Sequence, residues 1–311
     1  MPTVLITGGT GLIGKALSAM LVNKGYEVII LSRSSAKKQN NSSSISYAKW
    51  NIEQQTMDRD AVAKADYIIH LAGANVAEKR WTAKRKKEIV ESRTKSSALL
   101  IKYLNETPNK VKALISASAI GWYGENLSKE KAFKEDAPAA NDFLGQTCKQ
   151  WEQSIQPVAA LQKRLVILRT GIVISHDGGA LMEFKKPLQF GIAAILSSGE
   201  QIISWIHIED LCRIYLFAIE HNIAGIFNAV APKPVSNKTL TLTLAKDIRG
   251  RTFIPIHVPS FVLKIVLGEM SIEVLKSATV SAEKIRQQGF QFLFPSIEAA
   301  LEEIKTNIPG K

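Results

Sequence analysis

The sequence contains very few cysteines. Of its 311 residues only Cys148 and Cys212 are cysteines, and they do not form a Cys-x-x-Cys pair. A disulfide framework or a structural zinc site needs more such residues at closer spacing, so the sequence predicts neither, and it favours a reducing compartment. We therefore expect no bound metal.

Long hydrophobic runs are missing as well. No apolar stretch approaches the ~20 residues that a helix needs to span a bilayer. The N-terminus also lacks the basic, apolar and cleavage regions of a signal peptide, because its first apolar run, Val4-Leu5-Ile6, is short. These observations predict a cytoplasmic protein without a membrane partner.

Acidic residues are outnumbered, with 28 Asp and Glu against 40 Lys and Arg, which gives a net charge of +12. Part of this excess is local, at Lys79-Arg80 and over residues 84–87. Such a basic run suits either nucleic acid or a solvated helix face that attracts anionic metabolites. Because no nucleic-acid module is recognisable and Trp81 is the only aromatic residue in the run, the sequence favours the second interpretation.

The most informative motif that is present is TGGTGLIG, residues 7–14, directly behind the first apolar run. In such a strand–turn–helix, Gly8 permits the tight turn, Gly11 lets the backbone approach a pyrophosphate, and Gly14 lets the helix pack on the strand. The helix N-terminus then offers free N–H groups to the anion. The motif predicts a dinucleotide site whose residues are Gly8, Thr10, Gly11, Leu12, Ile13 and Gly14.

The end of the second predicted strand indicates which dinucleotide binds. This strand ends in Ser32-Arg33, where an NAD-specific site would usually carry an acidic residue. An arginine suits the 2′-phosphate of NADP, and Ser32 can donate a further hydrogen bond to it. We therefore predict NADP(H) as cofactor, the alternative being that Arg33 is a solvated loop residue.

Strand-like and helix-like segments alternate along the first half of the chain. Strands are predicted over 3–7, 27–31, 67–72 and 112–118, and helices over 12–24, 82–104 and 145–160. This order predicts an α/β fold, a Rossmann-type doubly wound parallel sheet. The small residues of Leu71-Ala72-Gly73 would let the cofactor pass close to the third strand. We expect an NADP-binding domain over 1–178, with a returning strand near 225–230, and a smaller C-terminal α/β substrate domain over 179–311.

These motifs together resemble the extended short-chain dehydrogenase/reductase superfamily, and within it the NAD-dependent epimerase/dehydratase-like subgroup called epimerase family proteins. The resemblance is carried by TGGTGLIG and by the segments 71–93, 116–124 (SASAIGWYG), 168–175, 204–211, 227–232, 259–270 and 287–304. It implies that Glu88 and Arg93 flank the cofactor cleft and that Val173 lies near the nicotinamide. Taken alone, Glu88 and Arg93 would be ordinary residues of a charged helix.

The sequence departs from the superfamily pattern at the catalytic residues. Active members use a Ser or Thr, a Tyr, and a Lys four residues after the Tyr, which lowers the tyrosine pKa. With Glu152 as an anchor, Leu144 stands at the tyrosine position and Cys148 at the lysine position, and no Tyr-x-x-x-Lys occurs within 130–160. Leucine cannot transfer a proton, and cysteine is a poor substitute for a permanent cation.

The resulting hypothesis is an NADP(H)-binding oxidoreductase or epimerase-like enzyme. Its substrate would be an unidentified small molecule, a nucleotide sugar or another carbonyl compound. Ser118 is the candidate for polarising that substrate and Tyr123 for proton transfer, although aromatic packing is the favoured role of Tyr123. The alternative is a non-catalytic NADP(H)-binding regulatory or sensor protein. A homodimer through the helices at 82–104 and 145–160 is left open.

Overall fold

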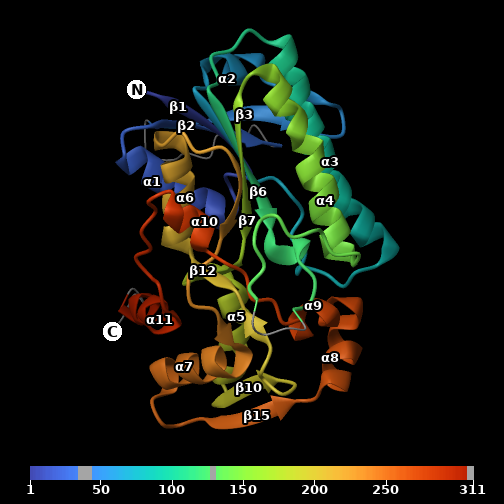
Figure 1. The fold of residues 1–311 in the computed structure, drawn as a ribbon, viewed down its shortest axis with the longest axis vertical. Coiled ribbons are helices and arrows are strands. Elements are labelled where there is room, and N and C mark those ends of the chain that lie inside the picture. Colours follow the sequence, from blue (N-terminus) through green and yellow to red (C-terminus); the bar gives the residue numbers. More distant parts are fainter. Residues whose placement is uncertain (34–43, 127–130, 307–311) are drawn as a thin grey trace.

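The computed structural model describes residues 1–33, 44–126 and 131–306. Its centre is an eight-stranded sheet in the order β13-β7-β6-β5-β1-β2-β3-β4 (Figure 1). All neighbouring pairs are parallel except β3 and β4. The strands are β1 (Thr3–Thr7), β2 (Glu27–Ser32), β3 (Ile45–Asn51), β4 (Thr56–Met57), β5 (Tyr67–His70), β6 (Ala113–Ala119), β7 (Arg164–Thr170) and β13 (Gly225–Ala229). The predicted Rossmann-like class is confirmed.

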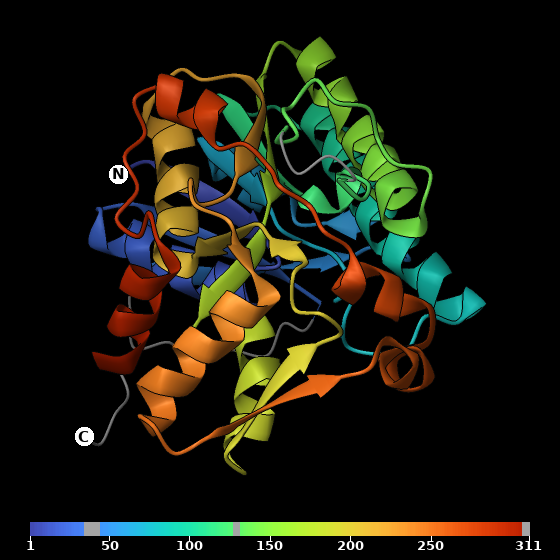
Figure 2. The same ribbon diagram turned by 60° about the horizontal axis from the view of Figure 1, so that its bottom comes forward.

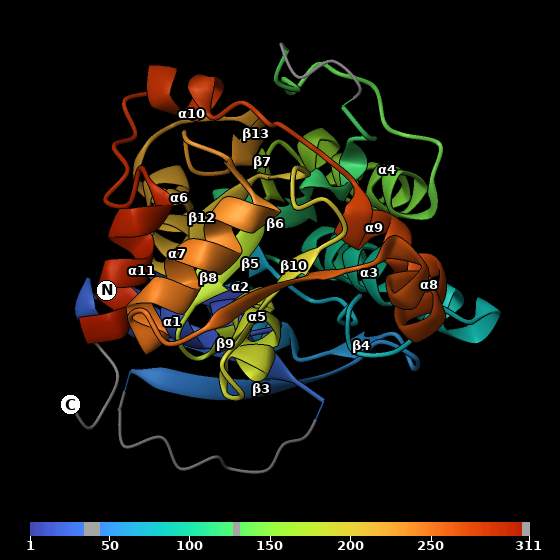
Figure 3. The ribbon, with the colours of Figure 1, turned by 90° about the horizontal axis from the view of Figure 1, so that it is seen from below.

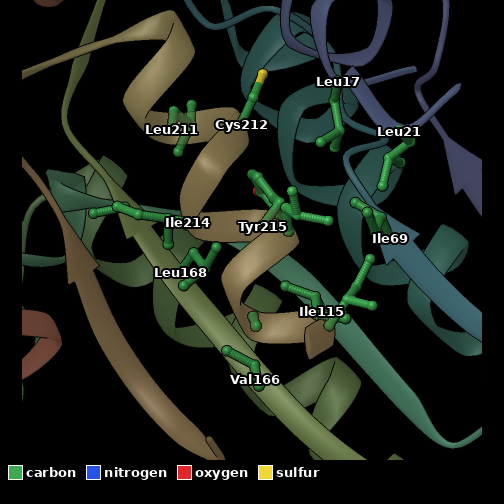
Figure 4. Close-up of a cluster of buried hydrophobic side chains, with 14 of the residues drawn as sticks. Leu17, Leu21, Ile69, Ile115, Val166, Leu168, Leu211, Cys212, Ile214 and Tyr215 are labelled. Atoms are coloured by element: carbon green, nitrogen blue, oxygen red, sulfur yellow. The ribbon is translucent and has the colours of Figure 1, made fainter. Parts of the chain in front are cut away.

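Helices cover both faces of this sheet because its central strands are apolar on both sides. Along β1, Val4 and Ile6 point to one face and Leu5 to the other, as the two-residue period of a strand requires. The first face is covered by α1 (Leu12–Asn23) and α6 (Ile208–Glu220), whose side chains meet those of β5, β6 and β7 in Figure 4. The second face is covered by α2 (Arg59–Lys64), α3 (Ala83–Glu106) and α4 (Phe143–Ile155).

Local chemistry explains where the long helices begin and end. α3 begins behind Thr82, whose side chain accepts the N–H of Arg85. α4 begins behind Asp142, which caps it in the same way, and gives way at Gln156 to a 3₁₀ turn over Gln156–Leu161. The predicted helix over 145–160 is therefore too long, because Pro157 lacks the N–H that would continue an α-helix.

The C-terminal part builds a third apolar core from small sheets and helices (Figure 2). β12 (Trp205–His207), β8 (Ile172–Ser175) and β9 (Gly178–Gly179) form one sheet, β10 (Ile192–Leu196) pairs with β15 (Ile254–Val258), and β11 (Ile202–Ile203) pairs with β14 (Val235–Ser236). The core is closed by α5 (Ala180–Leu188), α7 (Asn237–Arg249) and α11 (Ile297–Thr306). Between them the chain forms α8 (Ser260–Leu267), a 3₁₀ turn (Gly268–Met270), α9 (Ser271–Leu275) and α10 (Glu283–Gln287).

Within the described residues, none of the helices has both the length and the apolarity that crossing a membrane requires.

Candidate functional site

The turn between β1 and α1 leaves no room for a side chain against the backbone at Gly8 and Gly14. Gly8 has a φ of +71°, and a Cβ on it would lie 2.8 Å from the backbone carbon of Leu71. A Cβ on Gly14 would lie 2.4 Å from the carbonyl oxygen of Gly8. At Gly11, in contrast, the nearest atom to such a Cβ is 3.4 Å away. The turn is thus packed on its inner side and open at Gly11, as close approach by a phosphate would require.

The N-terminus of α1 is suited to an anion. Gly11 is the N-cap and provides no side-chain acceptor, and no acidic residue stands in the first turn. The positive end of the helix dipole is therefore uncompensated by the helix itself. Leu12 and Ile13 are half-buried at this end, Thr10 is exposed, and Leu12 packs against β9, where a Cβ on Gly179 would lie 3.2 Å from it.

Behind the turn, Thr7 and His70 lock β1, β5 and α3 together. The Thr7 hydroxyl accepts the N–H groups of Leu71 and Ala72 at 3.1 Å each, so its proton is left for Nδ1 of His70 at 2.7 Å. Nε2 of His70 then donates to Ser96 and Ser97, whose own hydroxyls donate to the carbonyl of Arg93. Complete burial, assisted by the nearby Arg93 charge, lowers the pKa of His70 to about 3.

Arg93 lies against the segment that follows β5. The Arg93 guanidinium donates to the carbonyls of Ala74 at 3.1 Å and Ile89 at 2.9 Å, and it packs on Gly73, where a Cβ would lie 3.0 Å from its carbon. It also stacks on the Trp151 ring at 4.8 Å, and burial lowers its pKa. The exposed Glu88 side chain pairs with Arg85 at 2.8 Å.

Ser32 and Arg33 stand at the end of β2, with Ser32 half-buried and Arg33 exposed. Gly9 of the glycine turn rests on the side chain of Ile30, two residues before Ser32 and hence on the same face of the strand. The register pairs Ser32 with the exposed Lys49 of β3. Lys49 therefore shares the face of Ser32 and of the glycine turn. This lysine was not among the predicted site residues, because β3 has no continuous apolar run that would mark it as a strand in the sequence.

Ser118 lies inside the protein rather than at an open cleft. Its hydroxyl donates to Oε1 of Glu152 at 2.7 Å, and that carboxylate also accepts Nε and Nη2 of Arg169 at 2.8 and 2.9 Å. All three side chains are buried. The ion pair between Glu152 of α4 and Arg169 of β7 thus receives a further hydrogen bond from Ser118 of β6. The proton of the Ser118 hydroxyl is held in this bond.

Tyr123 belongs to the same network. It is completely buried, its hydroxyl donates to Oδ1 of Asn228 at 2.7 Å and accepts from Nη1 of Arg169 at 3.0 Å, and its ring stacks on Phe133. Burial raises the pKa of Tyr123 to about 12. The hydroxyl therefore points into a satisfied interior network, and the ring packs on Phe133.

The residues at the tyrosine and lysine positions of the superfamily pattern lie together. A Cβ on Gly121 would lie 3.2 Å from Cβ of Leu144 and 3.7 Å from the Cys148 sulfur, so both side chains pack under the turn that follows β6. The backbone N–H of Ala119 donates to the Cys148 thiol, yet burial raises the pKa of this thiol to about 12. Neither side chain can exchange a proton with a substrate near neutral pH.

Val173 and His207 lie in paired strands, since β8 and β12 align Val173 with Ile206. Nδ1 of His207 accepts the N–H of Glu209 at 3.3 Å and so caps α6, and its Nε2 lies 3.1 Å from Glu303. Among the residues that the structure describes, no three His, Cys, Asp or Glu side chains are arranged to hold a metal ion.

The basic run at the start of α3 is partly neutralised. Arg85 is buried and pairs with Glu78 and Glu88, and Lys86 pairs with Glu269. These ion pairs reduce the positive charge that this face offers to a polyanion.

Comparisons with known proteins agree with this geometry. The model of the NAD dependent epimerase/dehydratase family matches residues 4–229, and a domain of unknown function, DUF1731, matches residues 258–304. An epimerase family protein of Staphylococcus haemolyticus is 35% identical over 305 residues, which is 98% of this chain and 99% of the relative. The epimerase family protein YfhF of Bacillus subtilis is 33% identical and covers 97% of each chain.

Solved structures show the same similarity. A human epimerase family protein, solved with NADPH, has a TM-score of 0.86 and 30% identity, covering 98% of this chain and 100% of the human one. A nucleoside-diphosphate sugar epimerase from Corynebacterium glutamicum has a TM-score of 0.75 and 29% identity, covering 100% of this chain and 63% of its own.

Proposed function

Because the chain belongs to the NAD-dependent epimerase/dehydratase family, we propose that it binds NADP(H) and transfers hydride between this cofactor and a small molecule. The observation that carries the cofactor choice is that Ser32 and Lys49 pair in register on the face of the glycine turn, with the exposed Arg33 following Ser32 at the end of β2. A 2′-phosphate carries about −1.5 to −2 charges at neutral pH, like other phosphate monoesters, so two cations and a hydroxyl match it. The human relative solved with NADPH supports the same choice.

The other cofactor contacts follow from the shape of the turn. The open backbone at Gly11 and the N–H groups of Leu12 and Ile13 would hold the pyrophosphate. The small residues Ala72 and Gly73 would let the ribose pass, with the Arg93 guanidinium fixed behind them by its bonds to Ala74 and Ile89. Val173 lies in β8, which follows β7 directly after Gly171. We propose that it borders the nicotinamide, which supplies the hydride when bound.

The proton that accompanies the hydride must come from a group other than the usual pair. Ser118 and Tyr123 have their hydroxyls bound inside the buried network around Arg169, and Leu144 is apolar. We assign Ser118 and Tyr123 to the architecture of the site. Because none of these side chains would supply a proton, we propose that the substrate exchanges its proton with solvent. The substrates would be carbonyl or carbinol compounds, nucleotide sugars included.

A second candidate is a non-catalytic NADP(H) sensor. It is favoured by the inert Leu144 and Cys148 side chains at the positions where catalysis would need a phenol and an ammonium. A regulatory protein needs the cofactor site and has no need for a proton donor.

The test is turnover of bound NADPH. The purified chain is loaded with NADPH and mixed with carbonyl compounds, which can accept a hydride, or loaded with NADP+ and mixed with carbinols and nucleotide sugars, which can donate one. The nicotinamide absorbance and the products formed are followed. A changed absorbance or a new product with at least one compound supports the enzyme, and the absence of both with every compound supports the sensor.

A double variant, Leu144→Tyr with Cys148→Lys, rebuilds the pair, and Leu144→Phe with Cys148→Met is the matched control. Activity that appears only in the rebuilt variant would show that the fold positions substrate and cofactor but lacks the proton donor. NADPH oxidation that is equally fast in the native chain and in both variants would show that the native proton route bypasses these positions.

A further inference from the structure

The Arg93 side chain reaches from α3 to α4. The two helices lie side by side over one face of the sheet, as Figure 1 and Figure 3 show from two directions. The Arg93 guanidinium stacks on the ring of Trp151, which stands one turn after Cys148 on the same side of α4. Burial raises the pKa of the Cys148 thiol to about 12, and the nearby Arg93 charge is the largest effect that opposes this rise. A cation from α3 thus lies beside the α4 position at which the superfamily pattern carries a lysine.

The same guanidinium lies at the carboxyl ends of two neighbouring strands. A Cβ on Gly73, behind β5, would lie 3.0 Å from Cζ of Arg93. The backbone N–H of Ala119, at the end of β6, donates to the Cys148 thiol, and β5 pairs with β6. Ligands of open α/β sheets bind at the carboxyl ends of the strands. Arg93 therefore lies where the ends of β5 and β6 form part of the proposed cofactor site.

No carboxylate balances the charge of Arg93 in the part of the chain that the structure describes. Its Nη1 donates to two backbone carbonyls, whereas Arg85 on the same helix pairs with two carboxylates. A half-buried cation without an anion costs free energy, and burial accordingly lowers the pKa of Arg93. An unbalanced cation at the ends of the strands favours a role toward a bound ligand.

Cysteine at position 148 leaves space for this arrangement. A lysine in place of Cys148 would be several atoms longer and would bring its ammonium against the guanidinium of Arg93. Two like charges in a poorly solvated site repel each other and lower each other's pKa. The lysine of α4 and the arginine of α3 are therefore alternatives, and this chain has the arginine.

We propose that Arg93 supplies from α3 the positive charge that the superfamily pattern supplies from α4. Because this role depends on the cofactor site proposed above, its effect is on the dinucleotide, and the chain binds NADPH more tightly than NADP+. The nicotinamide ring of NADP+ carries a positive charge that NADPH lacks, so a fixed cation raises the free energy of the oxidised form alone. At an effective dielectric constant of about 20, two unit charges roughly 10 Å apart change an affinity by about tenfold.

This preference suits a carbonyl reductase. When both forms of the cofactor are present, the chain is loaded with NADPH, and it releases NADP+ readily after hydride transfer.

The test is isothermal titration calorimetry with NADPH and with NADP+ on the native chain, Arg93→Gln and Arg93→Lys. Lys102→Gln, which removes an exposed charge from the same helix, is the matched control. The native chain and the control are expected to bind NADPH about tenfold more tightly than NADP+. Arg93→Gln should lower this ratio about tenfold, because the repulsion of the oxidised ring is lost, and Arg93→Lys should keep most of it.

A purely structural role of Arg93 would weaken the binding of both forms alike, so the ratio separates the two roles. An unchanged ratio in Arg93→Gln would overturn the proposal, and so would an equal fall of the ratio in Lys102→Gln. A chain that binds neither form would contradict the cofactor site itself and the role of Arg93 with it.

Moving the charge back to α4 gives a second readout. The double variant Arg93→Gln with Cys148→Lys is expected to recover the preference for NADPH, and Arg93→Gln with Cys148→Met is not. Urea unfolding needs no cofactor. Cys148→Lys should lower the unfolding midpoint more in the native chain, where two cations meet, than in the Arg93→Gln background. An equal loss in both backgrounds would contradict the placement of the Arg93 charge beside Cys148.

Discussion

Replacing Ser118 by alanine removes the hydroxyl that donates to Glu152 at 2.7 Å inside the protein. A hydrogen bond from a neutral donor to a buried charge contributes about 1.5–3 kcal/mol. Both groups are at least 96% buried, so solvent screens this bond little. We therefore expect Ser118→Ala to lower the free energy of unfolding by about 2 kcal/mol, and to leave NADPH affinity unchanged, since the hydroxyl points toward α4.

The measurement is urea unfolding of the native chain and the variant, analysed by linear extrapolation. Ser116→Ala is the matched control, because Ser116 is equally buried on the same strand and donates only to the adjacent carbonyl of Ala117. It should cost about 1 kcal/mol or less. In a Glu152→Ala background, where Arg169 has lost its carboxylate, Ser118→Ala should have little further effect.

A Ser118→Ala variant that keeps the free energy of unfolding of the native chain but loses turnover on an identified substrate would refute the structural role of this hydroxyl. That result would return Ser118 to the substrate-polarising role that the sequence suggested.

The remaining predictions concern the glycine turn and pH. Gly14→Ala should abolish NADPH binding, because its Cβ would lie 2.4 Å from the Gly8 oxygen. Gly25→Ala meets no atom within 4 Å but is strained by a φ of +83°, so it should lower stability and still retain NADPH binding in the same fluorescence titration. His70 is neutral in the folded chain, with its pKa lowered from 6.5 to about 3. Below pH 6.5 His70 is therefore protonated in the unfolded state but stays neutral in the folded state. The free energy of unfolding should fall by about 1.4 kcal/mol per pH unit as the pH drops from 6.5 toward 3. His70→Asn should flatten this part of the unfolding profile, and an unchanged slope would contradict the assignment.

The sequence allowed the central fold to be predicted where apolar runs were continuous. β1, β2, β5 and β6 are buried on both faces, so their runs of Val, Ile and Leu stand out. β3 was missed because Ile45–Asn51 is only partly buried and mixes polar with apolar residues after a Ser- and Asn-rich stretch. The pairing of β3 with β2 depends on contacts between distant segments, which the sequence does not show. Lys49 was therefore not predicted to lie opposite Ser32.

The glycine turn was predictable because the motif that identifies it lies inside eight residues, although the packing of Gly8 on Leu71 depends on the fold. The network around Arg169 was not predictable. It joins Ser118 to Glu152, 34 residues away, and Tyr123 to Asn228, 105 residues away. Nothing in the sequence indicates that these polar side chains satisfy one another. The sequence suggested catalytic roles for the Ser118 and Tyr123 hydroxyls, and their hydrogen bonds within this network could be seen only in the structure.

The most direct test of the account is a paired fluorescence titration with NADPH and NADH. It is run on the native chain, on Arg33→Glu, on Lys49→Glu, and on Lys64→Glu, which changes an exposed lysine of α2 far from the site. We expect the native chain to prefer NADPH, and each of the first two variants to lose about tenfold in NADPH affinity, about 1.4 kcal/mol, with NADH and the Lys64→Glu control unaffected. Equal native affinity for both dinucleotides, or equal losses for both in Arg33→Glu, would contradict the proposed 2′-phosphate site.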